Sequence, residues 1–201
     1  MRRLLSLGVI YNLFQEFIGS DLFWSQYLAR HLGDVSGMAI LDLGCGTSTI
    51  LNYLPDTVAY LGVEPSEQYV QQAIREYSGR GKWIAKTASE LETDEDLHGC
   101  YDLVMANGVF HHLNDDESYQ MARVAHKLLK AGGRFVSIDC SFVEGMKSYG
   151  RLLTSMDRGK FVRTPVEYER FMHKYFPSCN MCIDSDMSKL GYVYTVLSGI
   201  K

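Results

Sequence analysis

The sequence has no long apolar run and no strong excess of charge of either sign. Its apolar runs have the length of strands, well below the roughly 20 residues that a membrane-spanning helix needs. Lysine and arginine total 20 against 24 aspartate and glutamate, which gives a formal net charge of −4 at pH 7. A broad basic surface for nucleic acid is therefore not expected, and neither nucleic acid nor a membrane is a predicted partner.

Cysteine is sparse and lacks the spacing of a structural metal site. There are five cysteines in 201 residues, and only Cys179 and Cys182 form a C-x-x-C pair. No second C-x-x-C and no nearby histidine pair completes a zinc site. We therefore expect reduced thiols in a cytoplasmic protein and no metal site.

The N-terminal segment MRRLLSLGVIY superficially resembles a signal peptide, because two arginines precede a short apolar stretch. Polar Asn12, Gln15 and Glu16 follow at once, and no small-residue cleavage site appears. We therefore do not expect a secretory signal.

Apolar segments of strand and helix length alternate along the chain, which predicts an α/β fold with a mostly parallel sheet and helices on both faces. No repeat, linker or low-complexity stretch divides the 201 residues, so a single domain 1–201 is expected. The expected strands are 39–43, 60–63, 82–86, 102–106 and 134–138, followed by a hairpin of 181–187 and 192–197 around 189–191. The expected helices are 47–54, 66–77 and 114–129.

Two regions lie outside this alternation. Residues 1–35 have a helical pattern of apolar positions and are expected to form a cap. Residues 141–177 form an insert between the fifth and sixth strands.

The segment ILDLGCGTSTI, residues 40–50, indicates a ligand-binding turn. A buried strand runs into Gly44 and Gly46, whose missing side chains let a ligand approach the backbone. The following turn presents free backbone N–H groups. About 20 residues after the glycines, the apolar strand YLGVE ends in Glu64, where a carboxylate can bind both hydroxyls of a ribose. The two segments predict a site for a nucleoside-bearing cofactor.

The glycine spacing fits a dinucleotide site only in part. The pattern G-x-G-x-x-G requires glycine at position 49, which is Thr49, and G-K-[ST] of a phosphate-binding loop is absent. Asp42 at the strand end would repel a pyrophosphate but attract an ammonium or sulfonium group. The pattern therefore favours S-adenosylmethionine (SAM) over NAD.

These motifs make the chain resemble the class I SAM-dependent methyltransferases. LDLGCGTS is similar to their first motif and LGVEPS to their second. YDLVMANGVFHHL resembles the fourth-strand motif, and LLKAGGRFVSID the helix, turn and fifth strand. The resemblance implies a Rossmann-like seven-stranded sheet whose last strand is antiparallel, with SAM as cofactor and S-adenosylhomocysteine as product. It also implies that residues 1–35 and the insert 141–177 build the lid and the substrate wall.

The resemblance and the positions at strand ends together nominate a set of cofactor-binding residues. Tyr11 and Gln15 lie four apart on the N-terminal helical segment, where they would either cover the cofactor or simply pack on the sheet. The full set is Tyr11, Gln15, Asp42, Gly44, Cys45, Gly46, Ser48, Glu64, Pro65, Ala88, Ser89, Asn107 and Gly108.

Three residues at the same edge are candidates for a general base: His111, His112 and Asp139. A base is needed only when the acceptor keeps its proton near neutral pH, and imidazole titrates in that range. The alternative is that the histidine pair only packs the loop against the following helix.

The insert is rich in basic and aromatic residues, which suit an anionic acceptor unless they form an ordinary solvated face. The residues nominated for substrate contact are Tyr149, Arg158 and Arg163, with Arg151 and Lys160 beside them. We expect a SAM-dependent methyltransferase that acts on oxygen or nitrogen of a small molecule. The alternatives are a SAM-binding protein without transferase activity and an NAD-binding oxidoreductase.

Overall fold

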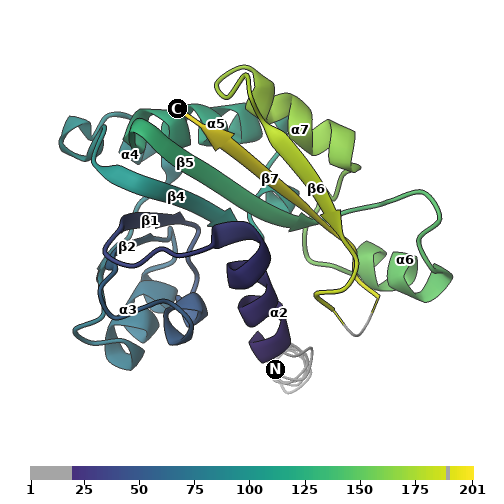
Figure 1. Cartoon of the computed structure of the whole chain (residues 1–201), viewed down its shortest axis with the longest axis horizontal. Helices are drawn as coiled ribbons and strands as arrows, with labels where there is room; N and C mark the ends of the chain where they lie inside the picture. Colours follow the sequence, from purple (N-terminus) through teal and green to yellow (C-terminus); the bar gives the residue numbers. More distant parts are fainter. Residues whose placement is uncertain (1–19, 189–190) are drawn as a thin grey trace, which may run out of the picture.

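The computed structural model of the chain describes residues 20–188 and 191–201. Their core is a seven-stranded sheet of order β3-β2-β1-β4-β5-β7-β6 (Figure 1). The strands are β1 (Ala39–Leu43), β2 (Ala59–Val63), β3 (Lys82–Ile84), β4 (Tyr101–Asn107), β5 (Leu129–Cys140), β6 (Asn180–Asp184) and β7 (Tyr194–Ile200).

Strand β7 is antiparallel to both of its neighbours, β5 and β6, and every other strand pair is parallel. This confirms the predicted seven-stranded sheet with an antiparallel last strand. The carboxyl ends of β1, β2, β4 and β5 meet at one edge, where parallel sheets bind ligands.

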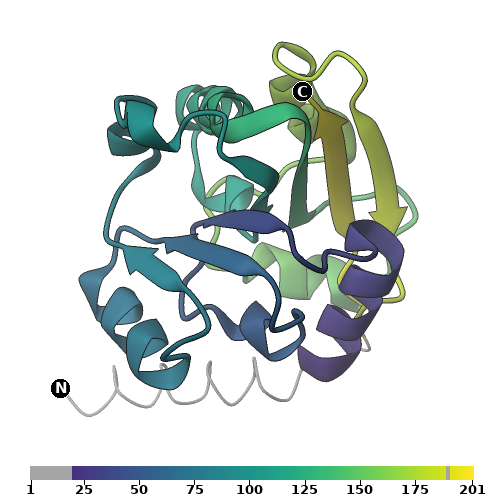
Figure 2. The same cartoon turned by 60° about the vertical axis from the view of Figure 1, so that its left-hand side comes forward.

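Helices cover both faces of the sheet (Figures 1 and 2). Along β1, the side chain of Ile40 packs in one core cluster while Leu41 and Leu43 pack in the other, as the alternation of a strand requires. The first face carries α2 (Ser20–Tyr27), the π-helical turn η1 (Leu28–Leu32), the 3₁₀ turn η2 (Thr49–Asn52) and α3 (Glu67–Glu76). The second carries α4 (Ala88–Glu92), α5 (Asp115–Leu128) and α7 (Pro165–His173).

Two predicted helix boundaries were wrong. The helix expected over 47–54 is only the 3₁₀ turn η2, because Ser48 before it adopts a left-handed conformation with φ of 59° and Pro55 follows closely. Helix α5 ends at Leu128, and β5 begins at the next residue. The glycines expected to stop that helix therefore lie inside a strand.

The late strands also differ from the prediction. Strand β6 ends at Asp184 and β7 begins only at Tyr194, so the connection is much longer than a tight turn around 189–191. Met187 leaves the strand because its side chain is fully buried in the core cluster that also holds Tyr27.

The insert 141–177 divides into two parts. Helix α7 packs on α5 and β7 and places Tyr168, Phe171 and Met172 in the core. Helix α6 (Ser148–Ser155) lies apart from the sheet, near the ends of β6 and β7 (Figure 1). Among residues 20–188 and 191–201, no helix combines the length and apolarity needed to cross a bilayer.

Candidate functional site

The turn after β1 brings the backbone of the glycine motif to the ligand edge. Gly44 and Gly46 have φ of 70° and 53°, a region that favours glycine. A Cβ at position 44 would lie 2.7 Å from Val109 Cγ2, whereas a Cβ at position 46 would meet no atom within 4 Å. Gly44 is therefore needed for packing, and Gly46 borders open space through which a ligand can approach.

Glu64 follows β2 and faces the glycine turn. Its Oε2 accepts a hydrogen bond from the Gly46 amide at 3.2 Å, and its Oε1 accepts one from the Ser66 amide at 2.9 Å. Each carboxylate oxygen has a further lone pair, so two hydroxyl donors can still be bound. Pro65 is exposed between Glu64 and Ser66, the N-cap of α3.

Asp42 is buried on the face of the sheet that α2 covers. Its Oδ2 accepts a hydrogen bond from the Tyr60 hydroxyl at 2.9 Å, while its Oδ1 is buried without a partner. Burial raises the pKa of Asp42 to about 7; the Tyr60 hydrogen bond opposes this shift and the charge of Glu64 adds to it. The carboxyl group therefore titrates near neutral pH and would be held ionised by a nearby cation.

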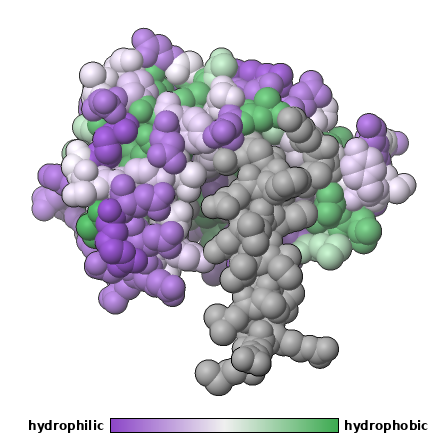
Figure 3. All heavy atoms as spheres, turned by 90° about the horizontal axis from the view of Figure 1, so that it is seen from below, coloured by the Kyte–Doolittle hydropathy of each residue, from purple (hydrophilic) through white to green (hydrophobic). Residues whose placement is uncertain are grey.

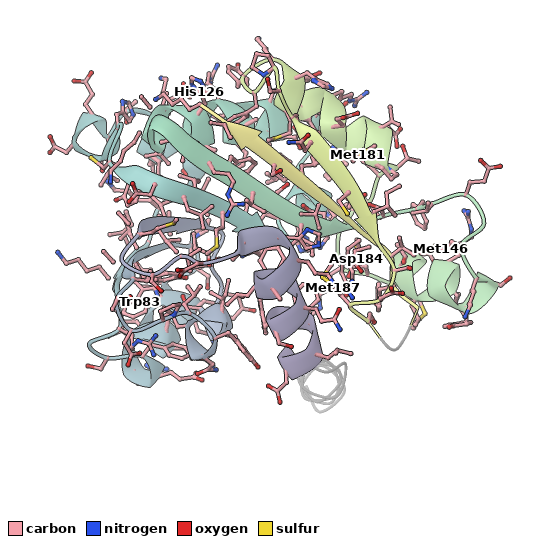
Figure 4. The ribbon with its side chains drawn as sticks, in the orientation of Figure 1. Trp83, His126, Met146, Met181, Asp184 and Met187 are labelled. Atoms are coloured by element: carbon pink, nitrogen blue, oxygen red, sulfur yellow. The ribbon has the colours of Figure 1, made fainter. Side chains whose placement is uncertain are left out.

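Ser48 connects this carboxyl group to Trp83. The indole Nε1 donates to Ser48 Oγ at 2.8 Å, and Ser48 Oγ lies 3.1 Å from the Tyr60 hydroxyl. Because Tyr60 has one proton and gives it to Asp42, the Ser48 hydroxyl can donate to the Tyr60 oxygen. Trp83, Ser48, Tyr60 and Asp42 thus form a continuous polar chain below β1 and β2, where Figure 4 labels Trp83.

Asn107 ends β4 at the same edge, next to Gly108. Its Oδ1 accepts a hydrogen bond from the fully buried Tyr27 hydroxyl at 2.7 Å, and its Nδ2 is buried without a partner. Unpaired buried polar atoms are uncommon in proteins and require an explanation. Asp42 Oδ1 supplies an unpaired acceptor and Asn107 Nδ2 an unpaired donor at the same edge, as expected for groups that a ligand completes.

Other predicted cofactor residues are engaged within the protein. The Cys45 sulfur packs beside Gly62, and burial raises the pKa of this thiol to about 12. Ala88 begins α4 and packs on the core, while the Ser89 hydroxyl donates to Gln120 of α5 at 3.0 Å. We therefore leave Ser89 out of the proposed cofactor site. Tyr11 and Gln15 lie outside the described residues.

His111 is buried between two carboxylates. Its Nδ1 lies 2.7 Å from Asp139 Oδ1, which also accepts a hydrogen bond from the His111 amide, and its Nε2 lies 3.3 Å from Asp157 Oδ1. Burial, the largest influence, lowers the pKa of His111, but the Asp139 hydrogen bond and the charges of Asp139 and Asp157 together outweigh it. The net pKa is raised, so the ring favours its cationic form.

His112 is exposed, and its ring centroid lies 4.1 Å from that of His111. Desolvation and the charge of His111 lower the pKa of His112. The two neighbouring imidazoles therefore differ: His111 favours the protonated form and His112 the neutral form, which can accept a proton.

Arg163 is used inside the protein. Its guanidinium donates to the carbonyl oxygens of Phe110, Phe161 and Leu113 and to the Asp115 carboxylate. It is buried and lies 4.9 Å from the centroid of the Phe171 ring. Arg163 thus fastens the insert to the loop before α5, and we do not include it among the acceptor-binding residues.

Tyr149 lines a cavity of about 480 Å³ between the loop before α6 and the segment after β6. Its charged lining residues are Glu144, Lys147 and Asp186, so the cavity is not purely basic.

Arg158 is exposed and lies on the segment after α6. In the view from below, apolar surface gathers on the side where Figure 1 places α6 (Figure 3), and Leu152 and Met156 of this region are 60% and 71% exposed.

Sequence reasoning missed four residues that shape the site: Tyr27, Tyr60, Trp83 and Asp157. The first three occupy apolar positions of a helix or strand pattern, and their hydroxyl or indole groups give no periodic signal. Asp157 stands in a charged run that is indistinguishable from a solvated surface.

Residues 41–135 match the family model described as "Methyltransferase domain". None of the curated proteins compared matches the sequence. Many solved structures share the fold at low sequence identity.

One of them is Burkholderia thailandensis 1,6-didemethyltoxoflavin-N1-methyltransferase, solved with 1,6-didemethyltoxoflavin and S-adenosylhomocysteine. The TM-score is 0.68 at 18% identity, over 99% of this chain and 86% of that one. Another is Haemonchus contortus phosphoethanolamine N-methyltransferase 2 with SAM, with a TM-score of 0.70 at 16% identity, over 92% and 55% of the two chains.

A possible exported protein from Bordetella parapertussis has a TM-score of 0.68 at 17% identity, over 89% of this chain and 65% of that one. The chain thus spans less than two thirds of the length of the Bordetella and Haemonchus proteins. Residues 41–135 thus match a methyltransferase domain, and the chain is similar in fold to class I SAM-dependent methyltransferases.

Proposed function

We propose that the protein transfers the sulfonium methyl group of SAM to oxygen or nitrogen of a small polar molecule. The observation that supports this most directly is the pair of unpaired buried atoms, Asp42 Oδ1 and Asn107 Nδ2, beside the glycine turn. A ligand end that carries both an ammonium and a carboxylate, as the methionine part of SAM does, matches one acceptor and one donor. A pyrophosphate would instead face the Asp42 carboxyl group, which argues against NAD.

The proposed cofactor contacts follow from this arrangement. Asp42 Oδ1 would accept from the ammonium group, Asn107 Nδ2 would donate to the carboxylate, and Glu64 would bind the ribose diol. The backbone of Gly44 to Gly46 would pass beside the cofactor. When bound, SAM supplies an electrophilic methyl group, and the protein's main task is to align the acceptor with it, which alone can be worth several kcal/mol.

We assign the proton-accepting role to His112 rather than to His111. His111 is held by Asp139 and Asp157 and favours its cationic form, so it is poorly suited to take another proton. His112 favours the neutral form and is exposed. The expected result is that His112→Gln lowers kcat and changes its pH profile while SAM affinity stays the same. Asp116→Asn, at an exposed position in the first turn of α5, should leave both unchanged.

We place the acceptor in the cavity beside α6, lined by Tyr149 and Lys147. Lys147 would attract an anionic group, while Glu144 and Asp186 would bind an amine or hydroxyl groups. A polar acceptor that carries both kinds of group suits this lining better than a purely anionic one.

We also propose a cytoplasmic location, because all five cysteines are free thiols.

The first experiment is calorimetric titration with SAM, S-adenosylhomocysteine and NAD. We expect both adenosyl compounds to bind with micromolar affinity and NAD not to bind. Binding of NAD alone would contradict the cofactor assignment. A screen of small polar acceptors, read by mass spectrometry for a gain of one methyl group, then tests transfer. SAM binding without transfer to any acceptor would favour the binding-protein alternative.

A further inference from the structure

A second cluster of chemically active groups lies beside the proposed methyl-transfer site. His111, Cys140 and Asp157 each offer one ligand atom, and these atoms all lie within 4.8 Å of one another. They come from three separate segments: the 3₁₀ turn η4 (Phe110–His112), the end of β5 and the segment after α6. His111 and Cys140 are buried, and Asp157 is half-buried.

The orientation of His111 is fixed by a carboxylate on its other nitrogen. Asp139 holds Nδ1 at 2.7 Å, so Nε2 faces Asp157. Histidines that bind metals almost always have this arrangement, with the second ring nitrogen donating to a carboxylate, a carbonyl or water. Asp139 thus orients the ring without itself facing the cluster.

The spacing of two of the ligand atoms suits a tetrahedral ion. His111 Nε2 and Asp157 Oδ1 are 3.3 Å apart. Two ligands held at about 2.0–2.1 Å from a tetrahedral zinc ion are separated by about 3.3–3.4 Å. The Cys140 sulfur lies no more than 4.8 Å from the other two ligand atoms. Given a zinc–sulfur bond of about 2.3 Å, it would have to approach by at most about 1 Å to complete the same geometry.

We propose that His111 Nε2, the Cys140 sulfur and the Asp157 carboxylate bind one divalent cation of the zinc type, with a fourth position open to water. A nitrogen, sulfur and oxygen donor set suits zinc or cobalt, and not magnesium or calcium, which prefer oxygen alone.

The charge balance of this binding is favourable. Without the metal, the Cys140 sulfur carries its thiol proton, and the two carboxylates that flank His111 are both positioned to accept a ring N–H. On binding, the cation displaces the thiol proton and the proton on His111 Nε2, and both go to solvent. One dication replaces two protons, so the net charge of the buried cluster does not change.

The surrounding backbone holds the cluster in place. The Gly159 amide donates to Asp157 Oδ1 at 2.8 Å, and a Cβ at position 159 would lie 2.2 Å from His111 Cδ2. The segment after α6 is therefore pressed against the imidazole ring. A bound cation would fasten this segment to η4 and β5, beside the proposed acceptor wall.

The test uses the 201-residue chain, metal-free and reduced, titrated with zinc chloride or cobalt chloride alone. We expect one metal ion per chain. The cobalt form should show ligand-field bands in the visible and a sulfur-to-cobalt band in the near ultraviolet. Cys140→Ser should abolish the sulfur band, and Asp139→Asn should weaken zinc binding about 10- to 100-fold.

Cys182→Ser is the matched control, because Cys182 is an exposed cysteine on β6, and it should change neither band nor affinity. Circular dichroism checks that each variant folds. If Cys140→Ser does not fold, the metal affinity of Asp157→Asn is measured in its place and should be lowered. Absence of stoichiometric binding, or binding that persists unchanged in the Cys140 and Asp157 variants, would overturn the proposal. Because neither SAM nor an acceptor is present, the outcome does not depend on the proposed function.

Discussion

The cofactor edge differs from the acceptor wall, the name we give to the region around Arg163 and His111 where the insert packs against the loop before α5. At the cofactor edge, Asp42 and Asn107 keep polar atoms without partners, so the site is electrostatically incomplete until a ligand arrives. At the acceptor wall, Arg163 has a partner for each terminal nitrogen, and His111 lies between two carboxylates. At the cofactor edge, polar groups are left unpaired and can bind a ligand. At the acceptor wall, polar groups are paired within the protein and hold the insert in place.

The largest expected effect is the loss of folding stability when the Arg163 contacts of the acceptor wall are removed. Arg163→Ala leaves the half-buried carbonyl oxygen of Leu113 without its donor and removes the other guanidinium hydrogen bonds, to Phe110, Phe161 and Asp115. Together these losses should lower the free energy of unfolding by about 3–5 kcal/mol. Arg75→Ala is the matched control, because Arg75 is exposed in the last turn of α3 and its loss should change stability by less than about 0.5 kcal/mol. Urea denaturation measures both. Equal small effects would show that the Arg163 contacts contribute little.

The next effect concerns the pH dependence of stability. Because the pKa of folded Asp42 is raised from 3.8 to about 7, the folded state binds a proton more tightly than the unfolded state. Its contribution to stability is fully present below pH 4 and is lost as pH rises to 7, by up to about 4 kcal/mol at about 1.4 kcal/mol per unit. Asp42→Asn should flatten this part of the curve and leave the variant more stable than the parent at pH 8. A variant with the parent's pH slope would show that another group is responsible.

Glu64→Ala tests the cofactor edge directly. Losing a carboxylate that accepts two hydroxyl donors should weaken SAM binding about 100-fold or more, at about 1.5–3 kcal/mol for each charge-assisted hydrogen bond. Glu67→Ala, an exposed position in the first turn of α3, should leave the affinity unchanged. Calorimetry measures both, and unchanged affinity in the Glu64 variant would remove the ribose assignment.

The smallest expected effect separates backbone strain from ligand contact. Gly46 and Gly79 both have positive φ, and a Cβ at either position meets no atom within 4 Å. Gly46→Ala and Gly79→Ala should therefore each cost about 1–2 kcal/mol of stability. Only Gly46→Ala should weaken SAM binding as well, because only Gly46 borders the proposed site. Equal SAM affinities in the two variants would place the cofactor elsewhere.

The same contrast explains what could be predicted from the sequence. The sheet and the cofactor edge follow from local signals: apolar strands end in glycines or carboxylates, and parallel strands bring those ends together. Position at a strand end and the family resemblance together nominate Asp42, Gly44, Glu64 and Asn107, and the structure brings all four to one edge of the sheet. The helix predicted over 47–54 was wrong, because the left-handed backbone conformation of Ser48 cannot be recognised from the periodicity of apolar residues.

The acceptor wall could not be predicted in the same way. His111, Asp139 and Asp157 come from segments that meet only through the packing of the insert, and no spacing in the sequence links them. Arg163 was expected to face the acceptor because it stands in a basic run, but burial and hydrogen bonding direct it inward. A charged run alone does not distinguish a solvated arginine from one that fastens two loops.

The polar chain from Trp83 to Asp42 has a practical consequence. The indole donates to Ser48, and through Tyr60 it connects to the carboxyl group that we propose as a cofactor contact. Any change in the charge or position of Asp42 alters the polarity around the indole. The protein therefore carries an intrinsic fluorescent reporter of its own cofactor site. With only two tryptophans in the chain, Trp24→Phe would leave a single emission to follow.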